Sequence, residues 1–197
     1  MAMKKILSIL FLLPLMVGCN NEDILLTERD KIEKYLTSSR GLVPEEELSN
    51  TIEEEPQFYS TFGRYAYRYI VNYYDADREN RPTVEWGDRV EIRFNAYTFS
   101  GSEPSTSAIY WSNVPTIIKQ LGDKSTGTLD WSTEPLSITL GSTKILDGLE
   151  FTLPGCHEAD SVQVFMTSSL AYGKQLIGNV PKNSMVAWYM KIEKVTK

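Results

Sequence analysis

The fold assignment rests on the segment Leu136-Ser137-Ile138-Thr139-Leu140-Gly141-Ser142-Thr143-Lys144-Ile145-Leu146-Asp147-Gly148-Leu149-Glu150. Its first five residues alternate apolar and polar side chains, which is typical of a strand with one buried face. Gly141 begins a turn, and the residues that follow predict a short helix over Asp147–Leu153, which Pro154-Gly155 ends. A strand, a turn and a short helix in this order favour a domain that mixes sheet and helix.

Further strands are predicted on both sides of this segment. β-branched, aromatic and alternating apolar residues predict strands over Arg64–Tyr74, Arg89–Tyr97, Ser161–Thr167 and Met185–Val195. Pro115–Leu121 predicts a short helix, with Pro at its first position and Gly122 at its end. Several strands with one short interior helix indicate an α+β fold with an antiparallel sheet.

Four tyrosines fall on one face of the first predicted strand: Tyr65, Tyr67, Tyr69 and Tyr73. A row of tyrosines is either a platform for a ligand or a sheet face packed under other residues. We expect the second, with the N-terminal residues as the cover.

Three motifs together resemble the FKBP family of peptidyl-prolyl cis-trans isomerases. The segment 136–150 is similar to the family run F-x-L-G-x-x-x-V-I-x-G-W-E. Leu170-Ala171-Tyr172-Gly173, Val180-Pro181-Lys182-Asn183-Ser184 and Val186–Ile192 resemble A-Y-G … I-P-P-N-x-x-L-x-F-x-V-E-L, and Trp86–Val90 resembles K-x-G-D-x-V. The resemblance implies an FKBP-like domain over 61–197, in which a curved antiparallel sheet wraps around a short α-helix, with an insertion around 99–134.

The resemblance also implies a set of site residues. Tyr172 corresponds to the tyrosine whose hydroxyl meets a substrate carbonyl, the backbone N–H of Leu146 to a second donor, and Phe94 to another catalytic position. The remaining positions correspond to the walls of the substrate pocket, or cover it: Leu136, Ile145, Leu149, Val180, Trp188, Tyr110 and Trp111.

Several of these positions depart from the family pattern. Phe94 replaces a tyrosine and lacks its hydroxyl, and Leu149 replaces the tryptophan of the pocket floor. The family's Phe-Asp pair has its best counterpart in Tyr110-Trp111-Ser112, which has no carboxylate. Tyr110 and Trp111 either cover the groove or pack against the N-terminal residues.

Two functions of different classes follow from the resemblance. The first is a peptidyl-prolyl cis-trans isomerase that assists the folding of exported proteins by desolvating and twisting X-Pro bonds. The second is a catalytically weak or inactive module that binds proline-containing peptides or envelope proteins. Neither needs a metal or a cofactor, because rotation about the bond involves no nucleophile and no proton transfer.

The N-terminus predicts export and a lipid anchor. Lys4-Lys5 precedes the apolar run Ile6–Leu15, which is too short to span a bilayer and is typical of a signal peptide over 1–18. Gly18-Cys19 resembles a bacterial lipobox, so Cys19 is the expected lipidation site and membrane anchor; the alternative is an ordinary secretory signal cleaved elsewhere. We therefore expect a lipid-anchored protein of the cell envelope, in the outer membrane and facing the periplasm or the surface.

An acidic leader follows, over 19–60. Asn20-Asn21-Glu22-Asp23 is either similar to the surface-export signals of Bacteroidetes-type lipoproteins or an ordinary polar tether. Thr27 is the predicted cap of a short helix that ends near Ser39. The runs Glu45–Glu47 and Glu53–Glu55 are interpreted as a solvated tether, or else as a docking strip for a basic partner.

Composition excludes several other classes. The net charge of −6 is unsuitable for nucleic acid, which needs a basic surface. One histidine and two cysteines exclude a zinc finger and a disulfide framework. We expect His157 on the surface and Cys156 buried as a small apolar side chain.

Overall fold

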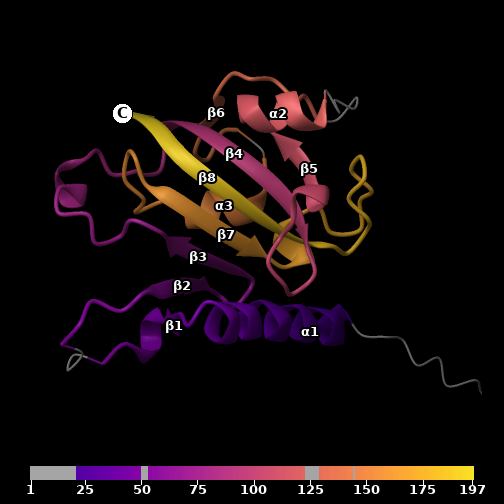
Figure 1. The fold of residues 1–197 in the computed structure, drawn as a ribbon, viewed down its shortest axis with the longest axis horizontal. Coiled ribbons are helices and arrows are strands. Elements are labelled where there is room, and N and C mark those ends of the chain that lie inside the picture. The colour runs from indigo at the N-terminus through magenta and orange to yellow at the C-terminus, as the bar shows by residue number, and fades with distance from the viewer. Residues whose placement is uncertain (1–20, 50–52, 123–128, 144) are drawn as a thin grey trace, which may run out of the picture.

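A computed structural model describes residues 21–49, 53–122, 129–143 and 145–197. In these residues one sheet of eight strands runs in the order β1-β2-β3-β7-β8-β4-β5, and β6 pairs with β4 beside this path (Figure 1). All pairs are antiparallel except β1 with β2. The strands are β1 Val43–Pro44, β2 Phe58–Phe62, β3 Ala66–Ile70, β4 Arg89–Phe99, β5 Ile109–Ser112, β6 Leu136–Thr139, β7 Ser161–Met166 and β8 Met185–Thr196.

Within the described ranges, three α-helices accompany the sheet: α1 Asn21–Lys34, α2 Pro115–Leu121 and α3 Asp147–Thr152. The predicted strands at β4, β6, β7 and β8 and the two predicted helices α2 and α3 are confirmed, and the fold is the expected α+β class. The strand predicted over Arg64–Tyr74 is shorter, because the chain turns after Ile70. The short strands β1, β2 and β5 were not predicted.

The two long central strands, β4 and β8, carry apolar side chains on both faces of the sheet. β4 pairs with β8 along its whole length, with Ala96 opposite Trp188. Alternate residues of β4 face opposite ways, so Phe94 and Ala96 lie in one core cluster while Tyr97 and Phe99 lie in another.

Helix α3 packs against the first face. Its Leu149 is buried in the same cluster as Phe94. Gly148 permits the close approach, since a Cβ at this position would lie 2.3 Å from the Met166 sulfur and 3.3 Å from the Leu170 carbonyl oxygen. The position of α3 therefore depends on the absence of a side chain at residue 148.

Helix α1 covers the second face, along the lower side of Figure 1. Ile32 of α1 is buried there with Tyr67 and Phe165, and so are Tyr35 and Leu36 of the π-helical segment Tyr35–Ser39 that continues α1. The leader is therefore not a free tether between residues 21 and 49, and the buried tyrosines of β3 are a packed face rather than a ligand platform.

Thr27 does not cap this helix, which begins six residues earlier at Asn21. Its hydroxyl donates to the carbonyl of Asp23 inside the helix. Glu45, in one of the acidic runs, accepts a hydrogen bond of 2.6 Å from the Ser60 hydroxyl on β2. The bond between Glu45 and Ser60 joins this acidic run to the sheet.

The insertion is anchored to β4 by Asn113, which is buried. Its side-chain nitrogen donates to the carbonyls of Ile92 and Glu134, and its side-chain oxygen accepts from the N–H of Phe94. The middle of the insertion and its end at Glu134 are thus both held to β4 through one amide. Helix α2 begins at Pro115 as expected and ends at Leu121, and Gly122 follows it with a φ of 76° that suits glycine.

No helix within the described ranges is both long and apolar enough to cross a bilayer. The predicted signal peptide and the lipidation site Cys19 lie outside the described residues.

Candidate active site

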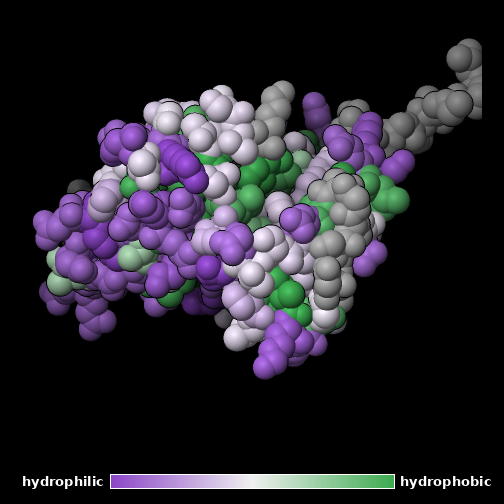
Figure 2. Space-filling model, turned by 90° about the horizontal axis from the view of Figure 1, so that it is seen from above, coloured by the Kyte–Doolittle hydropathy of each residue, from purple (hydrophilic) through white to green (hydrophobic). Residues whose placement is uncertain are grey.

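A pocket of about 330 Å³, lined mainly by apolar residues, opens beside the start of α3. Seen from above, on the side that bears α2 and β6, apolar side chains gather in the middle of the face between more hydrophilic surfaces (Figure 2). The pocket is lined by residues that come from β5, from the end of the insertion, from the segment before α3 and from the connection between β7 and β8: Trp111, Leu129, Ile145, Leu146, Ala171, Tyr172, Gln175 and Ile177.

Tyr172 is placed by a tight turn. The 3-10 helix Ser168–Leu170 follows β7, and the carbonyl of Ser168 accepts hydrogen bonds from the N–H groups of Ala171 and Gly173. Gly173 has a φ of 56°, which a residue without a side chain adopts readily. The two residues that flank Tyr172 are therefore fixed to a single carbonyl.

The hydroxyl of Tyr172 belongs to a chain of hydrogen bonds. It donates to the hydroxyl oxygen of Tyr110 at 3.3 Å, and the indole N–H of Trp188 donates to the same oxygen at 2.9 Å. Burial raises the pKa of Tyr172, and raises that of Tyr110 far above its ordinary value. Both hydroxyls are therefore protonated at neutral pH, and Tyr172 has a proton to offer to a ligand.

Leu146 contributes a backbone donor. It precedes α3 with extended dihedral angles, and its carbonyl accepts from the N–H groups of Leu149 and Glu150. Its own N–H makes no hydrogen bond to another residue in the described part of the chain. An N–H at the wall of this pocket, without a partner among the described residues, is a suitable donor for a peptide carbonyl.

Three aromatic rings support the pocket from behind. Phe94 and Trp188 stack with their centroids 4.4 Å apart, and the edge-on ring of Trp111 lies 4.8 Å from Phe94. The indole N–H of Trp111 donates to the carbonyl of Asp130, which holds the ring in place. Trp111 is thus the ring of this cluster that reaches the pocket.

The structure separates the expected site residues into two groups. Tyr172, Leu146, Ile145 and Trp111 line the pocket. The others lie behind it or in the adjoining core: Phe94, Leu149, Val180 and Trp188, each no more than 1% exposed, Tyr110, which is 7% exposed, and Leu136, which packs against the same core from β6. Their role in binding stays a prediction.

Sequence reasoning missed four residues of the lining. Ala171 adjoins the recognised Tyr172, so its position was available from the motif. Leu129, Gln175 and Ile177 lie in irregular segments, where neither periodicity nor a motif indicates which side chain reaches the pocket.

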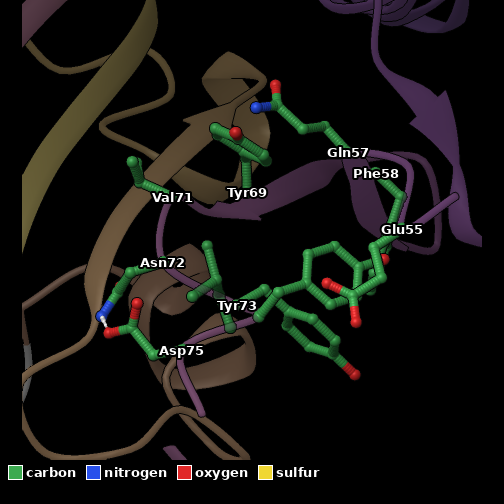
Figure 3. Close-up of a pocket in the computed structure, with 10 residues that line it drawn as sticks. Glu55, Gln57, Phe58, Tyr69, Val71, Asn72, Tyr73 and Asp75 are labelled. Atoms are coloured by element: carbon green, nitrogen blue, oxygen red, sulfur yellow. Dashed lines mark hydrogen bonds between the residues drawn. The ribbon is translucent and has the colours of Figure 1, made fainter.

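A second hollow, of about 280 Å³, lies between the turn after β3 and the start of β2 (Figure 3). The rings of Phe58 and Tyr73 pack edge to face with their centroids 4.7 Å apart, and the hydroxyl of Tyr74 donates to the carbonyl of Pro56. These aromatic side chains contact one another and join the leader to the turn. We therefore interpret this hollow as part of the packing between the leader and the turn after β3, and not as a ligand site.

Within the described ranges, no three His, Cys, Asp or Glu residues lie close enough together to bind an ion. His157 is buried, contrary to expectation, and Cys156 is buried as expected.

The sheet, the helix α3 and the pocket beside it define an α+β protein. A family model described as FKBP-type peptidyl-prolyl cis-trans isomerase matches residues 81–193, and the chain belongs to this family. A crystal structure of a peptidyl-prolyl cis-trans isomerase from Pseudomonas syringae pv. tomato is similar in fold, with a TM-score of 0.54 and 14% sequence identity over 92% of this chain and 99% of that one. No curated protein matches the chain.

Proposed function

We propose that the protein catalyses the cis–trans isomerisation of X-Pro bonds in peptide segments, at the pocket beside α3. The observation that carries the proposal is the pairing of apolar walls with two hydrogen-bond donors, the Tyr172 hydroxyl and the Leu146 N–H. Family membership supports the same reaction.

The chemistry follows from amide resonance. The rotation barrier of about 18–20 kcal/mol arises from partial double-bond character, and uncatalysed X-Pro isomerisation takes tens to hundreds of seconds. Apolar walls such as Ile145 remove water from the imide, and the donors hold carbonyl groups of the substrate while the bond turns. Tyr172 exchanges its long bond to Tyr110 for one to the substrate.

The test is the exchange rate of a short X-Pro peptide, measured by NMR. The wild-type protein should raise this rate well above the uncatalysed one. Tyr172→Phe should lower kcat/KM by about three- to tenfold, the equivalent of one hydrogen bond. Tyr74→Phe is the matched control, since its hydroxyl bonds to Pro56 away from the pocket. A wild-type rate equal to the uncatalysed one would contradict the proposal.

A second candidate function is peptide binding without useful catalysis. It is favoured by the pocket lining, which has no carboxylate among its described residues, and by the buried Phe94, which lacks a hydroxyl. In that case the peptide would shift protein resonances in a saturable way without a faster exchange rate.

We further propose that the protein works in the cell envelope on exported proteins, anchored by a lipid on Cys19. The basic and apolar residues before Cys19 support this placement. Cys19→Ala should move the protein out of the membrane fraction; an unchanged distribution would contradict lipid anchoring.

A further inference from the structure

A carboxylate of the leader reaches the turn that carries Tyr172. Glu28 of α1 is 6% exposed, and one of its oxygens accepts hydrogen bonds from both the backbone N–H and the hydroxyl of Ser168, at 2.9 and 3.1 Å. Ser168 is the first residue of the 3-10 helix Ser168–Leu170. Glu28 therefore satisfies one of the N–H groups that the start of a helix leaves without an internal partner.

The turn has no cap of its own at this position. Thr167, which precedes the 3-10 helix, makes no capping bond, and its hydroxyl is used by the Tyr65 carbonyl and the Ser169 side chain. Glu28 also makes no ion pair within 4 Å in the part of the chain described. Its carboxylate is satisfied by Ser168 as a hydrogen-bond acceptor.

The two sides of Ser168 connect α1 to Tyr172. On one side the N–H and hydroxyl of Ser168 are bound by Glu28; on the other its carbonyl accepts from the N–H groups of Ala171 and Gly173, at 3.2 and 2.8 Å. A shift of Ser168 would therefore move the residues on both sides of Tyr172.

We infer that Glu28 is a positioning residue for Tyr172, and that the leader helix helps to set the geometry of the pocket. This inference rests on the proposed function for its effect on rate, but its structural part stands apart from that function. Displacements of about 1 Å can change rates by as much as a hundredfold, so a loosened turn should affect the reaction even though Glu28 lies outside the pocket lining.

Three substitutions in the purified protein test the inference. Glu28→Ala removes the acceptor, while Glu28→Gln keeps an acceptor oxygen without the charge. Glu33→Ala is the matched control from the same helix, because the bonds of Glu33 go to Arg64 and Tyr67 on the β2–β3 hairpin.

Two signals report on position independently of catalysis: the ring resonance of Tyr172, in protein labelled at tyrosine and assigned with Tyr172→Phe, and hydrogen exchange at the Ser168 amide. Glu28→Ala should shift the ring resonance and speed the exchange. It should also lower kcat by about tenfold with a smaller change in KM. Glu28→Gln should stay within about twofold of the wild-type kcat because it retains an acceptor, and Glu33→Ala should leave all these readouts unchanged.

Unchanged Tyr172 and Ser168 signals in Glu28→Ala would overturn the inference, as would equal changes in Glu33→Ala. If the wild-type protein has no isomerase activity, the proposed function fails, while the two structural signals still decide whether Glu28 positions Tyr172.

Discussion

The hydroxyl of Tyr110 has two partners that differ in exposure. The indole N–H of Trp188, which is fully buried, donates to it at 2.9 Å, and the Tyr172 hydroxyl at the pocket wall donates to it at 3.3 Å. Tyr110 thus joins the buried Trp188 to Tyr172 at the pocket wall.

We therefore expect the substitution of Tyr110 to affect stability more, and the substitution of Tyr172 to affect rate more. Tyr110→Phe leaves the Trp188 N–H buried without a partner, which lowers the free energy of unfolding by about 1–3 kcal/mol. Tyr172→Phe leaves the Trp188 bond intact, so its loss of stability should be smaller and its loss of kcat/KM larger. Urea unfolding and peptide exchange on both variants check this order; a larger stability loss in Tyr172→Phe would contradict it.

At the scale of elements, the sequence predicts a strand or helix correctly where its pattern is long or where Pro and Gly mark its ends. The alternation of β4, and Pro115 and Gly122 at the ends of α2, identify those elements directly. β5 has four residues, three of them buried, so it lacks the alternation that marks a strand. In the pocket, motifs located Tyr172 and Leu146, whereas Leu129 and Ile177 reach it through irregular segments whose path depends on tertiary contacts.

The connection between α3 and β7 is another irregular segment whose contacts local sequence does not predict. His157 lies in it and is 6% exposed. Its backbone N–H donates to Asp160 at 2.8 Å, and Asp160 forms a buried ion pair with Arg78 at 2.9 Å. Arg78 comes from a segment about eighty residues earlier, so no local pattern around His157 indicated burial.

This histidine should make stability depend on pH. Burial, and then the charge of Arg78, lower the pKa of His157 below its ordinary value of 6.5. The unfolded chain therefore binds a proton more readily than the folded protein, so the stability is fully present above pH 6.5 and falls as the pH drops through the folded pKa. The slope can reach at most about 1.4 kcal/mol per pH unit.

Urea unfolding between pH 7.5 and 5 should show this decline, and His157→Gln should flatten it. The sequence contains one histidine, so its ring proton can be followed by NMR without an assignment problem. A midpoint at or above 6.5 for that proton would contradict the prediction.

At the scale of the whole molecule, the sheet is covered on both faces, by α3 and by the leader. Ile32 of the leader and Ala187 of β8 are far apart in sequence but pack in the same core cluster. Composition marked the leader as acidic and solvated, whereas a few apolar residues, such as Ile32 and Leu36, pack it against the sheet.

The leader and the family-matched region should therefore unfold together. Leu36 is fully buried against the sheet, so Leu36→Ala should lower the free energy of unfolding by about 2–5 kcal/mol. Leu26, which is 46% exposed on α1, is the matched control, and Leu26→Ala should change stability by no more than about 0.5 kcal/mol. Far-UV circular dichroism and tryptophan fluorescence should give the same urea midpoint in each protein, shifted only in Leu36→Ala. Trp188 lies in the other core cluster, so a fluorescence midpoint that ignores Leu36→Ala would mean that the leader unfolds separately.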